Sequence, residues 1–229
     1  MSPADLSGAT ANIVTLQAEV SGGKDASLLS GSPGGITSAL RLHTRVGQNL
    51  DRAEVAVYFN DPDYGLFNGM LFKDMVANGI RFEYSFFKAN VTSGSETAAP
   101  SIKLGLRSPS TGSWTSFTWE YYFNNCCLNG PPKNVWVSND VLNTTGASVV
   151  PTSPGGTGWW NTKWTPSDSR ASLAAWVTRL NTTMPNAMAD AVVENVRIGV
   201  GTYNPGVTSY VNSLRIAVGD YDWKWTFGG

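Results

Sequence analysis

Two stretches of the sequence decide its fold class: Gly-Ile-Arg-Phe-Glu-Tyr-Ser-Phe-Phe-Lys at residues 79–88 and Ser-Trp-Thr-Ser-Phe-Thr-Trp-Glu-Tyr-Tyr-Phe at residues 113–123. In both stretches bulky apolar side chains alternate with polar ones: Ile80, Phe82, Tyr84 and Phe86 share one face of the first, and Phe117, Trp119, Tyr121 and Phe123 share one face of the second. A period of two is typical of a β-strand with one buried and one solvated face. The two stretches therefore predict two aromatic-faced strands of an antiparallel sheet.

The same alternation extends outward along the chain, at residues 12–20, 38–46, 53–59, 101–107 and 221–227. Gly, Pro and Ser separate these segments, as they do in turns. Many short strands without a regular alternation of strands and helices favour an all-β fold: an antiparallel two-sheet β-sandwich of jelly-roll type. We expect residues 1–229 to form a single domain of this kind, since sandwiches of ~200–250 residues are common.

One or two short helices are expected within this sandwich. Residues 167–180 offer capping residues at the start, followed by apolar side chains at i, i+3, i+4 and i+7 from Leu173 to Leu180. Residues 69–77 form a weaker helical pattern. We expect the longer helix to cover an edge or an end of the sandwich.

The last third of the chain contains an imperfect repeat, in which residues 193–203 align with residues 211–221. A single repeat is too short for a solenoid or a propeller. The repeat instead predicts two long neighbouring strands with matching patterns, joined by a turn at Asn204-Pro205-Gly206.

A family resemblance follows from three features: the Gly-rich turn, the Ser-Tyr-Val-Asn-Ser-Leu-Arg-Ile stretch at residues 209–216 and the final aromatic strand. This pattern resembles the end of secreted bacterial β-sandwich domains with a concanavalin-like or carbohydrate-binding jelly roll. The strand from Trp114 to Trp119 is similar to the central strands of those modules. The resemblance implies an extracellular module that faces glycans or serves in adhesion.

Composition excludes several classes of protein. Charged residues make up 14% of the chain, below the ~25% of typical soluble proteins, and 16 basic residues are balanced by 17 acidic ones without any basic cluster. Nucleic acid is therefore a poor partner. The chain has no apolar run long enough for a transmembrane helix. Residues 1–6 lack the features of a signal peptide, so either a signal was removed or that route is not used.

Few residues are suited to nucleophilic or zinc chemistry. His43 is the single histidine, it lies in the middle of an expected strand, and no nucleophile elbow surrounds any serine. Cys126 and Cys127 are adjacent, which leaves three alternatives: a strained vicinal disulfide, two free thiols or bonds to another chain. Two sulfurs and one histidine do not complete a zinc site.

Aromatic residues provide the main candidates for binding. Trp159, Trp160 and Trp164 follow a Gly-rich segment at residues 154–158, and Tyr122 lies on the polar face of its strand. Indole rings stack on sugar rings while nearby polar groups orient the hydroxyls. The alternative is that most of these tryptophans fill an end of the sandwich beneath the helix.

Glu83 and Glu120 are the candidates for catalysis, because both project from the polar faces of aromatic strands. If the strands were neighbours in one concave sheet, the two carboxyl groups could face each other as in a glycosidase. The alternative is two solvated glutamates, each near an arginine or lysine.

Asp61 and Asp63 are the candidates for a metal site. They lie in the segment Asn-Asp-Pro-Asp-Tyr-Gly at residues 60–65, which supplies several oxygen ligands of the kind that calcium prefers. An ordinary turn around Pro62 is the alternative. Apart from this calcium site, no cofactor is expected.

We therefore expect a non-catalytic β-sandwich, secreted or on a particle surface, that binds a glycan or serves in adhesion. The second hypothesis is a structural subunit of a virion surface or an extracellular filament, with another protein subunit as its partner, including a second copy of this chain. The third is a polysaccharide-degrading enzyme, a glycoside hydrolase or a polysaccharide lyase, that uses the carboxylate pair.

Overall fold

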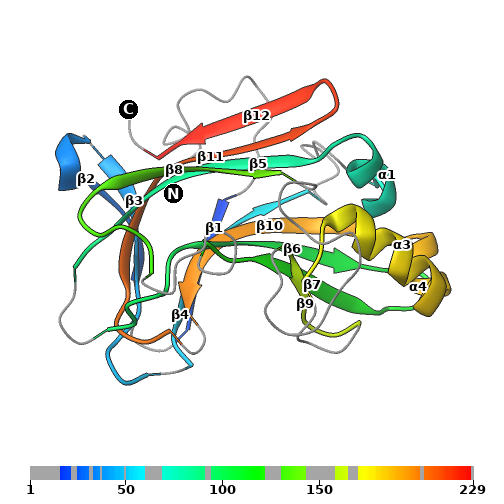
Figure 1. The fold of residues 1–229 in the computed structure, drawn as a ribbon, viewed down its shortest axis with the longest axis horizontal. Coiled ribbons are helices and arrows are strands. Elements are labelled where there is room, and N and C mark those ends of the chain that lie inside the picture. The colour runs from blue at the N-terminus through cyan, green and yellow to red at the C-terminus, as the bar shows by residue number, and fades with distance from the viewer. Residues whose placement is uncertain are drawn as a thin grey trace.

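The computed structural model describes residues 16–21, 25–30, 33–36, 38–48, 50–59, 69–90, 94–121, 130–142, 158–164, 170–201 and 204–227. Its strands form two antiparallel sheets that face each other, with the helices gathered at one end (Figure 1). The expected all-β two-sheet sandwich is thereby confirmed. None of the helices in the described ranges is long and apolar enough to cross a membrane.

The first sheet, called sheet A here, has the strand order β1-β4-β10-β6-β7-β9. Its strands are β1 (Leu16–Ser21), β4 (Arg52–Tyr58), β10 (Val192–Gly201), β6 (Ser101–Arg107), β7 (Trp114–Trp119) and β9 (Trp160–Asn161). Every neighbouring pair is antiparallel. Apart from β6 and β7, which follow each other in the chain, strands that are adjacent in this sheet come from distant parts of the sequence.

The second sheet, sheet B, has the order β2-β3-β11-β5-β8, and β12 also pairs with β11. Its strands are β2 (Asp25–Ser30), β3 (Ser38–His43), β11 (Thr208–Val218), β5 (Arg81–Lys88), β8 (Trp136–Leu142) and β12 (Tyr221–Thr226). Strand β11 is long enough to pair with β3 through its first half and with β12 through its second, both opposite β5.

The core lies between the sheets and is dominated by aromatic side chains. Tyr84 of sheet B meets Trp119 of sheet A edge to face, with ring centroids 6.3 Å apart, and Phe117 of sheet A contacts Trp176. The alternation in the sequence therefore assigned the faces correctly. Tyr121 and Trp223, which the same alternation places in the core, are only partly buried and pack against it.

The helices differ in number and position from the sequence prediction. Helix α3 (Leu173–Thr183) begins after Ser172, whose side chain accepts a hydrogen bond from the Ala175 amide at 3.1 Å. The expected start at residue 167 is wrong for the described part, because Ala171 forms a β-bridge with Trp159 instead. Helix α1 (Phe72–Ala77) confirms the weaker pattern, whereas α4 (Pro185–Ala189) and the short 3₁₀ turn η2 (Pro33–Gly35) were not foreseen.

The repeated segments form β10 and β11, but they do not pair with each other. Strand β10 lies in sheet A and β11 in sheet B, so the connection between them crosses from one sheet to the other. The prediction of two neighbouring strands is therefore wrong. The physical reason is that both sheets bury one face in the same core, so the same alternation suits strands of either sheet.

Candidate binding site

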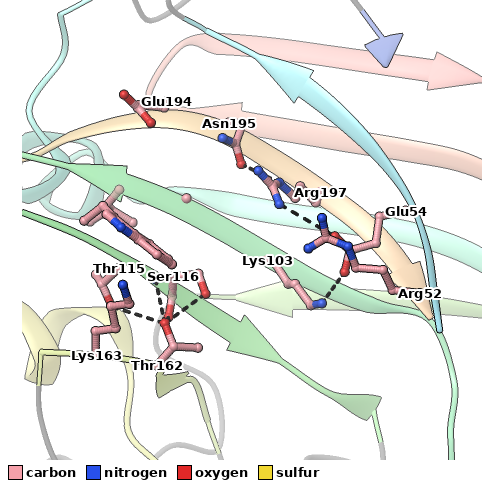
Figure 2. A pocket seen from close by; sticks show the side chains of 13 residues that line it. Arg52, Glu54, Lys103, Thr115, Ser116, Thr162, Lys163, Glu194, Asn195 and Arg197 are labelled. Carbon is pink, nitrogen blue, oxygen red and sulfur yellow. Dashed lines mark hydrogen bonds and ion pairs between the residues drawn. The ribbon is translucent and has the colours of Figure 1, made fainter. Parts of the chain in front are cut away.

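The outer face of sheet A, which points away from the core, contains a pocket of about 470 Å³. Strands β4, β10, β6 and β7 and the segment after β9 supply its lining (Figure 2). The outward side chains are set by alternation, since Asn195 and Arg197 project on the opposite side from the core residues Val196 and Ile198. The pocket is therefore made by residues far apart in sequence and adjacent in the sheet.

A β-bulge shapes one side of this pocket. The pairing of β10 with β6 shifts between Val193 and Asn195, which leaves Glu194 as the extra residue. Both Glu194 and Asn195 consequently line the pocket. Opposite Asn195 lies Gly105, where a Cβ atom would come within 2.5 Å of the Asn195 Oδ1. A glycine at this position therefore gives the amide its room, and Asn195 Oδ1 accepts a hydrogen bond from Arg197 Nε at 3.0 Å.

A buried carboxylate lies at the floor of the pocket. Glu54 is 1% exposed, and its Oε1 pairs with the Lys103 ammonium. Its Oε2 lies 3.8 Å from Arg197 Nη1. Gly199 makes room for this side chain, because a Cβ atom there would lie 2.4 Å from Glu54 Cγ. Glu54 therefore holds two cationic side chains in the floor (Figure 2).

The opposite wall combines hydroxyl groups with an exposed indole. Thr162 Oγ1 lies 3.2 Å from Ser116 Oγ and accepts a hydrogen bond from the Ser116 amide at 3.1 Å. Asn161 Oδ1 accepts from the amides of Lys163 and Trp164 at 2.9 and 2.7 Å, which fixes the turn after β9. This turn places the Lys163 ammonium 3.4 Å from the ring centroid of Trp114, a cation–π contact. The Trp114 side chain is 54% exposed.

The tryptophans predicted to bind a ligand do not form one surface. Trp159 and Trp164 are buried in the core, and the Trp159 ring lies 5.6 Å from that of Phe82. Trp160 is partly exposed and shares the outer face of sheet A through its pairing with Thr118. Tyr122 and residues 154–157 lie outside the described residues.

Trp114, like the rest of the pocket lining, was not predicted from the sequence. It is at the start of β7, on the same side of the strand as Ser116 and Thr118. An aromatic residue on the polar face of a strand was the signal that could have identified it.

Glu83 and Glu120 are not brought together. Glu83 is in β5 of sheet B, paired with Arg81 and Arg215 on the outer face, whereas Glu120 follows β7 in sheet A. Their strands are not neighbours, so the condition for a facing carboxylate pair is not met. Burial raises the pKa of Glu120, while hydrogen bonding from Trp160 and the charges of Arg170 and Lys103 oppose this rise.

Glu83 belongs to a ladder of ion pairs across sheet B. Asp140, Arg81, Glu83, Arg215 and Asp222 follow one another from β8 to β12 with alternating charge. The Arg215 guanidinium lowers the pKa of Asp222 through hydrogen bonds. Each charged side chain in the ladder has a neighbour of opposite charge, so the charges on this surface largely offset one another.

The remaining sequence candidates provide no further site in the described residues. Asp61 and Asp63, proposed as calcium ligands, and Cys126 and Cys127 lie outside them. Within the described ranges no group of three or more His, Cys, Asp or Glu side chains could hold a metal ion. His43 Nδ1 lies 2.9 Å from Thr208 Oγ1, so this ring joins β3 to β11.

The fold and the pocket define an antiparallel β-sandwich with a polar, tryptophan-bordered pocket on one outer face. No family model matches the chain, and no curated protein matches it. One solved structure, described as a crystal structure of domains CD (residues 230-489), is similar at a TM-score of 0.35 and 9% identity. The likeness covers 88% of this chain and 63% of that chain, so this chain spans less than two thirds of its neighbour.

Proposed function

We propose that the chain is a non-catalytic glycan-binding module, and that its binding site is the pocket on the outer face of sheet A. The observation that carries this proposal is Trp114, a 54% exposed indole at the border of a polar pocket in a chain whose other described tryptophans are less exposed. Large exposed aromatic side chains beside convergent polar groups are characteristic of ligand sites.

The chemistry of the pocket suits a sugar. An indole ring offers a flat apolar surface for the C–H-rich face of a pyranose. Around it, Ser116 and Thr162 supply hydroxyl groups and Asn195 an amide, all within the pocket lining. These groups both donate and accept hydrogen bonds, as sugar hydroxyls do.

A second tryptophan on the same face supports a chain-like ligand. Trp160 pairs with Thr118, which is four residues beyond Trp114 on β7. At ~3.3 Å per residue the backbone positions of Trp114 and Trp160 are separated by about 13 Å along the strand direction. Such a spacing gives an oligosaccharide two aromatic contacts on a single sheet face.

The low charge content and the sandwich fold support a secreted or particle-surface location for this module. Both features are typical of secreted and surface proteins.

A structural subunit is the second candidate function, and the outer strand β12 favours it. Among the described strands β12 pairs with β11 alone. It carries Tyr221, which is 57% exposed and stacks on Trp223 with ring centroids 5.6 Å apart. An aromatic edge strand is a surface on which a second β-strand can pair.

The test of the glycan-binding proposal is a glycan array followed by calorimetric titration of Trp114→Ala. The matched control is Tyr221→Ala, which removes an exposed ring from the other sheet. We expect Trp114→Ala to weaken binding at least tenfold at an unchanged melting temperature, and Tyr221→Ala to bind normally. A blank array, or equal binding by both variants, would refute the proposed site. Light scattering of the same samples tests the subunit alternative, which requires that Tyr221→Ala reduces self-association.

A further inference from the structure

The charge of the pocket differs from that of the chain. Across the whole sequence 16 basic residues face 17 acidic ones. The pocket lining contains four cations, Arg52, Lys103, Lys163 and Arg197, but only two carboxylates, Glu54 and Glu194. Cationic side chains are thus concentrated on this one face of sheet A, where a ligand would bind.

Both carboxylates of the lining already interact with cations of the protein. Glu54 is buried and paired with Lys103. Glu194 Oε1 lies 3.5 Å from the Nη1 of Arg107, which is not part of the lining. A negative charge entering the pocket would therefore meet carboxylates whose repulsion is partly offset by their own partners.

Lys163 is the cation best placed to meet a ligand. It makes no ion pair with a carboxylate of the described residues, and its side chain is exposed. Its backbone is fixed by Asn161, and its ammonium lies over the Trp114 ring. A cation and a sugar-stacking ring consequently occupy the same end of the pocket.

We propose that the glycan bound by this pocket is acidic: a sugar chain with carboxylate or sulfate substituents, recognised by Lys163 beside Trp114. This inference rests on the proposed glycan-binding function and names its ligand class. The apolar face of the sugar ring contacts the part of the Trp114 indole that the Lys163 ammonium leaves exposed, and the anionic substituent pairs with the ammonium. Arg197, at the other side of the pocket, meets an acidic substituent further along the chain (Figure 2).

The experiment compares matched acidic and neutral probes by isothermal titration calorimetry at 50 and 300 mM salt. Oligogalacturonate is paired with its carboxyl-reduced counterpart, and dextran sulfate is paired with dextran. The variants are Lys163→Gln, Trp114→Ala and the control Lys224→Gln, which removes the same charge from an exposed position in β12 of sheet B. Thermal unfolding verifies that each variant is folded.

We expect an acidic probe to bind at least tenfold more tightly than its neutral partner, with an affinity that falls as salt increases. Lys163→Gln should remove about tenfold in affinity for the acidic probe and weaken neutral binding much less, while Lys224→Gln has no effect. Whether oligogalacturonate or dextran sulfate responds distinguishes a carboxylate from a sulfate ligand.

Two results would overturn the inference and leave the glycan-binding function intact. One is equal affinity for acidic and neutral probes, with binding still lost in Trp114→Ala. The other is an equal loss in Lys163→Gln and Lys224→Gln, which indicates attraction by net charge alone. If no probe and no array glycan binds, the proposed function itself fails.

Discussion

The indole Nε1 of Trp160 donates a 2.9 Å hydrogen bond to the Oε2 of Glu120, and so joins the end of β7 to the edge strand β9. From the sequence, Trp160 is a candidate for ligand stacking and Glu120 a candidate for acid catalysis. In the structure the indole N–H of Trp160 and the carboxylate of Glu120 are hydrogen-bonded to each other. Since Glu120 is partly buried at the sheet edge, this bond stabilises its ionised form against the cost of desolvation.

Replacing Trp160 with Phe should therefore raise the pKa of Glu120 still further above its ordinary value. The pKa of a buried carboxyl group increases when a hydrogen bond to its charged form is lost. Titration of the Glu120 side-chain carbon by NMR measures the shift. Because a raised carboxyl pKa in the folded state costs stability only once pH rises above the unfolded pKa, Trp160→Phe should destabilise the protein more at pH 7 than at pH 4.

The control for this prediction is Trp136→Phe, which removes an indole donor that bonds to the Pro33 carbonyl at 3.0 Å in the other sheet. Its effect on the Glu120 pKa should be nil. An unchanged Glu120 pKa in Trp160→Phe would show that the hydrogen bond does not influence the carboxyl group.

Trp159 and Trp114 should respond in opposite ways to truncation. Trp159 is 1% exposed, and its backbone carbonyl accepts a 2.7 Å hydrogen bond from the Trp176 indole. Trp159→Ala leaves a cavity in the core and should cost about 3–5 kcal/mol of the free energy of unfolding. Trp114→Ala, at an exposed position, should cost less than about 1 kcal/mol. Urea denaturation measures both, and equal costs would contradict the assignment of Trp159 to the core.

Alternation predicted the faces of the strands well. A shift of one residue would turn every side chain to the other face, and the bulky aromatic residues leave little ambiguity about which face is buried. Phe82, Phe117 and Trp225 accordingly lie in the core. Alternation does not state which strands pair. The matching patterns of β10 and β11 therefore suggested neighbours, although the two strands lie in different sheets.

The pocket was not predicted for the same reason. Its lining comes from segments around Glu54, Lys103, Ser116, Lys163 and Arg197, which become adjacent only through the strand order. The start of α3 was missed because several polar residues before it could serve as a cap. The β-bridge of Ala171 with Trp159, a tertiary contact, determines which one does.

Replacing either of the two glycines beneath the pocket, Gly105 and Gly199, should destabilise the protein. At Gly105 a second substitution should relieve part of the cost. Gly105→Ala would place a Cβ atom 2.5 Å from Asn195 Oδ1, and should cost about 1–3 kcal/mol by overpacking. Adding Asn195→Ala removes the clashing amide. The double variant should therefore be more stable than the sum of the single effects, by an amount that a double-mutant cycle in urea measures.

Strictly additive costs would show that Gly105 and Asn195 do not share the space. Gly199→Ala serves as the comparison. No second side-chain substitution can relieve its clash, because the Cβ atom would also lie 2.6 Å from the backbone carbonyl oxygen of Ala53.

A buried lysine gives the protein an unusual dependence on alkaline pH. Lys88 is 1% exposed, and its Nζ donates hydrogen bonds of 2.7 Å to the carbonyls of Ser95 and Glu96. Burial, together with the charge of Lys133, lowers the pKa of Lys88 from its ordinary 10.5 to about 8. Between these two values the unfolded chain binds the proton that the folded chain has released.

The stability of the protein should therefore increase as pH rises from 8 towards 10, because the unfolded state binds more protons there than the folded state. The slope approaches at most 1.36 kcal/mol per pH unit for one proton, so we expect a gain of about 1–2 kcal/mol. Beyond pH 10 the gain should reverse, since burial raises the pKa of Tyr84 and the unfolded chain releases that proton first.

Urea denaturation at pH 7, 8, 9 and 10 tests this on the native chain, on Lys88→Met and on the control Lys73→Met. Lys88→Met should be less stable at every pH, because two backbone carbonyls lose their donor, but its stability should not rise between pH 8 and 10. A rise of equal size in Lys88→Met would show that another group is responsible.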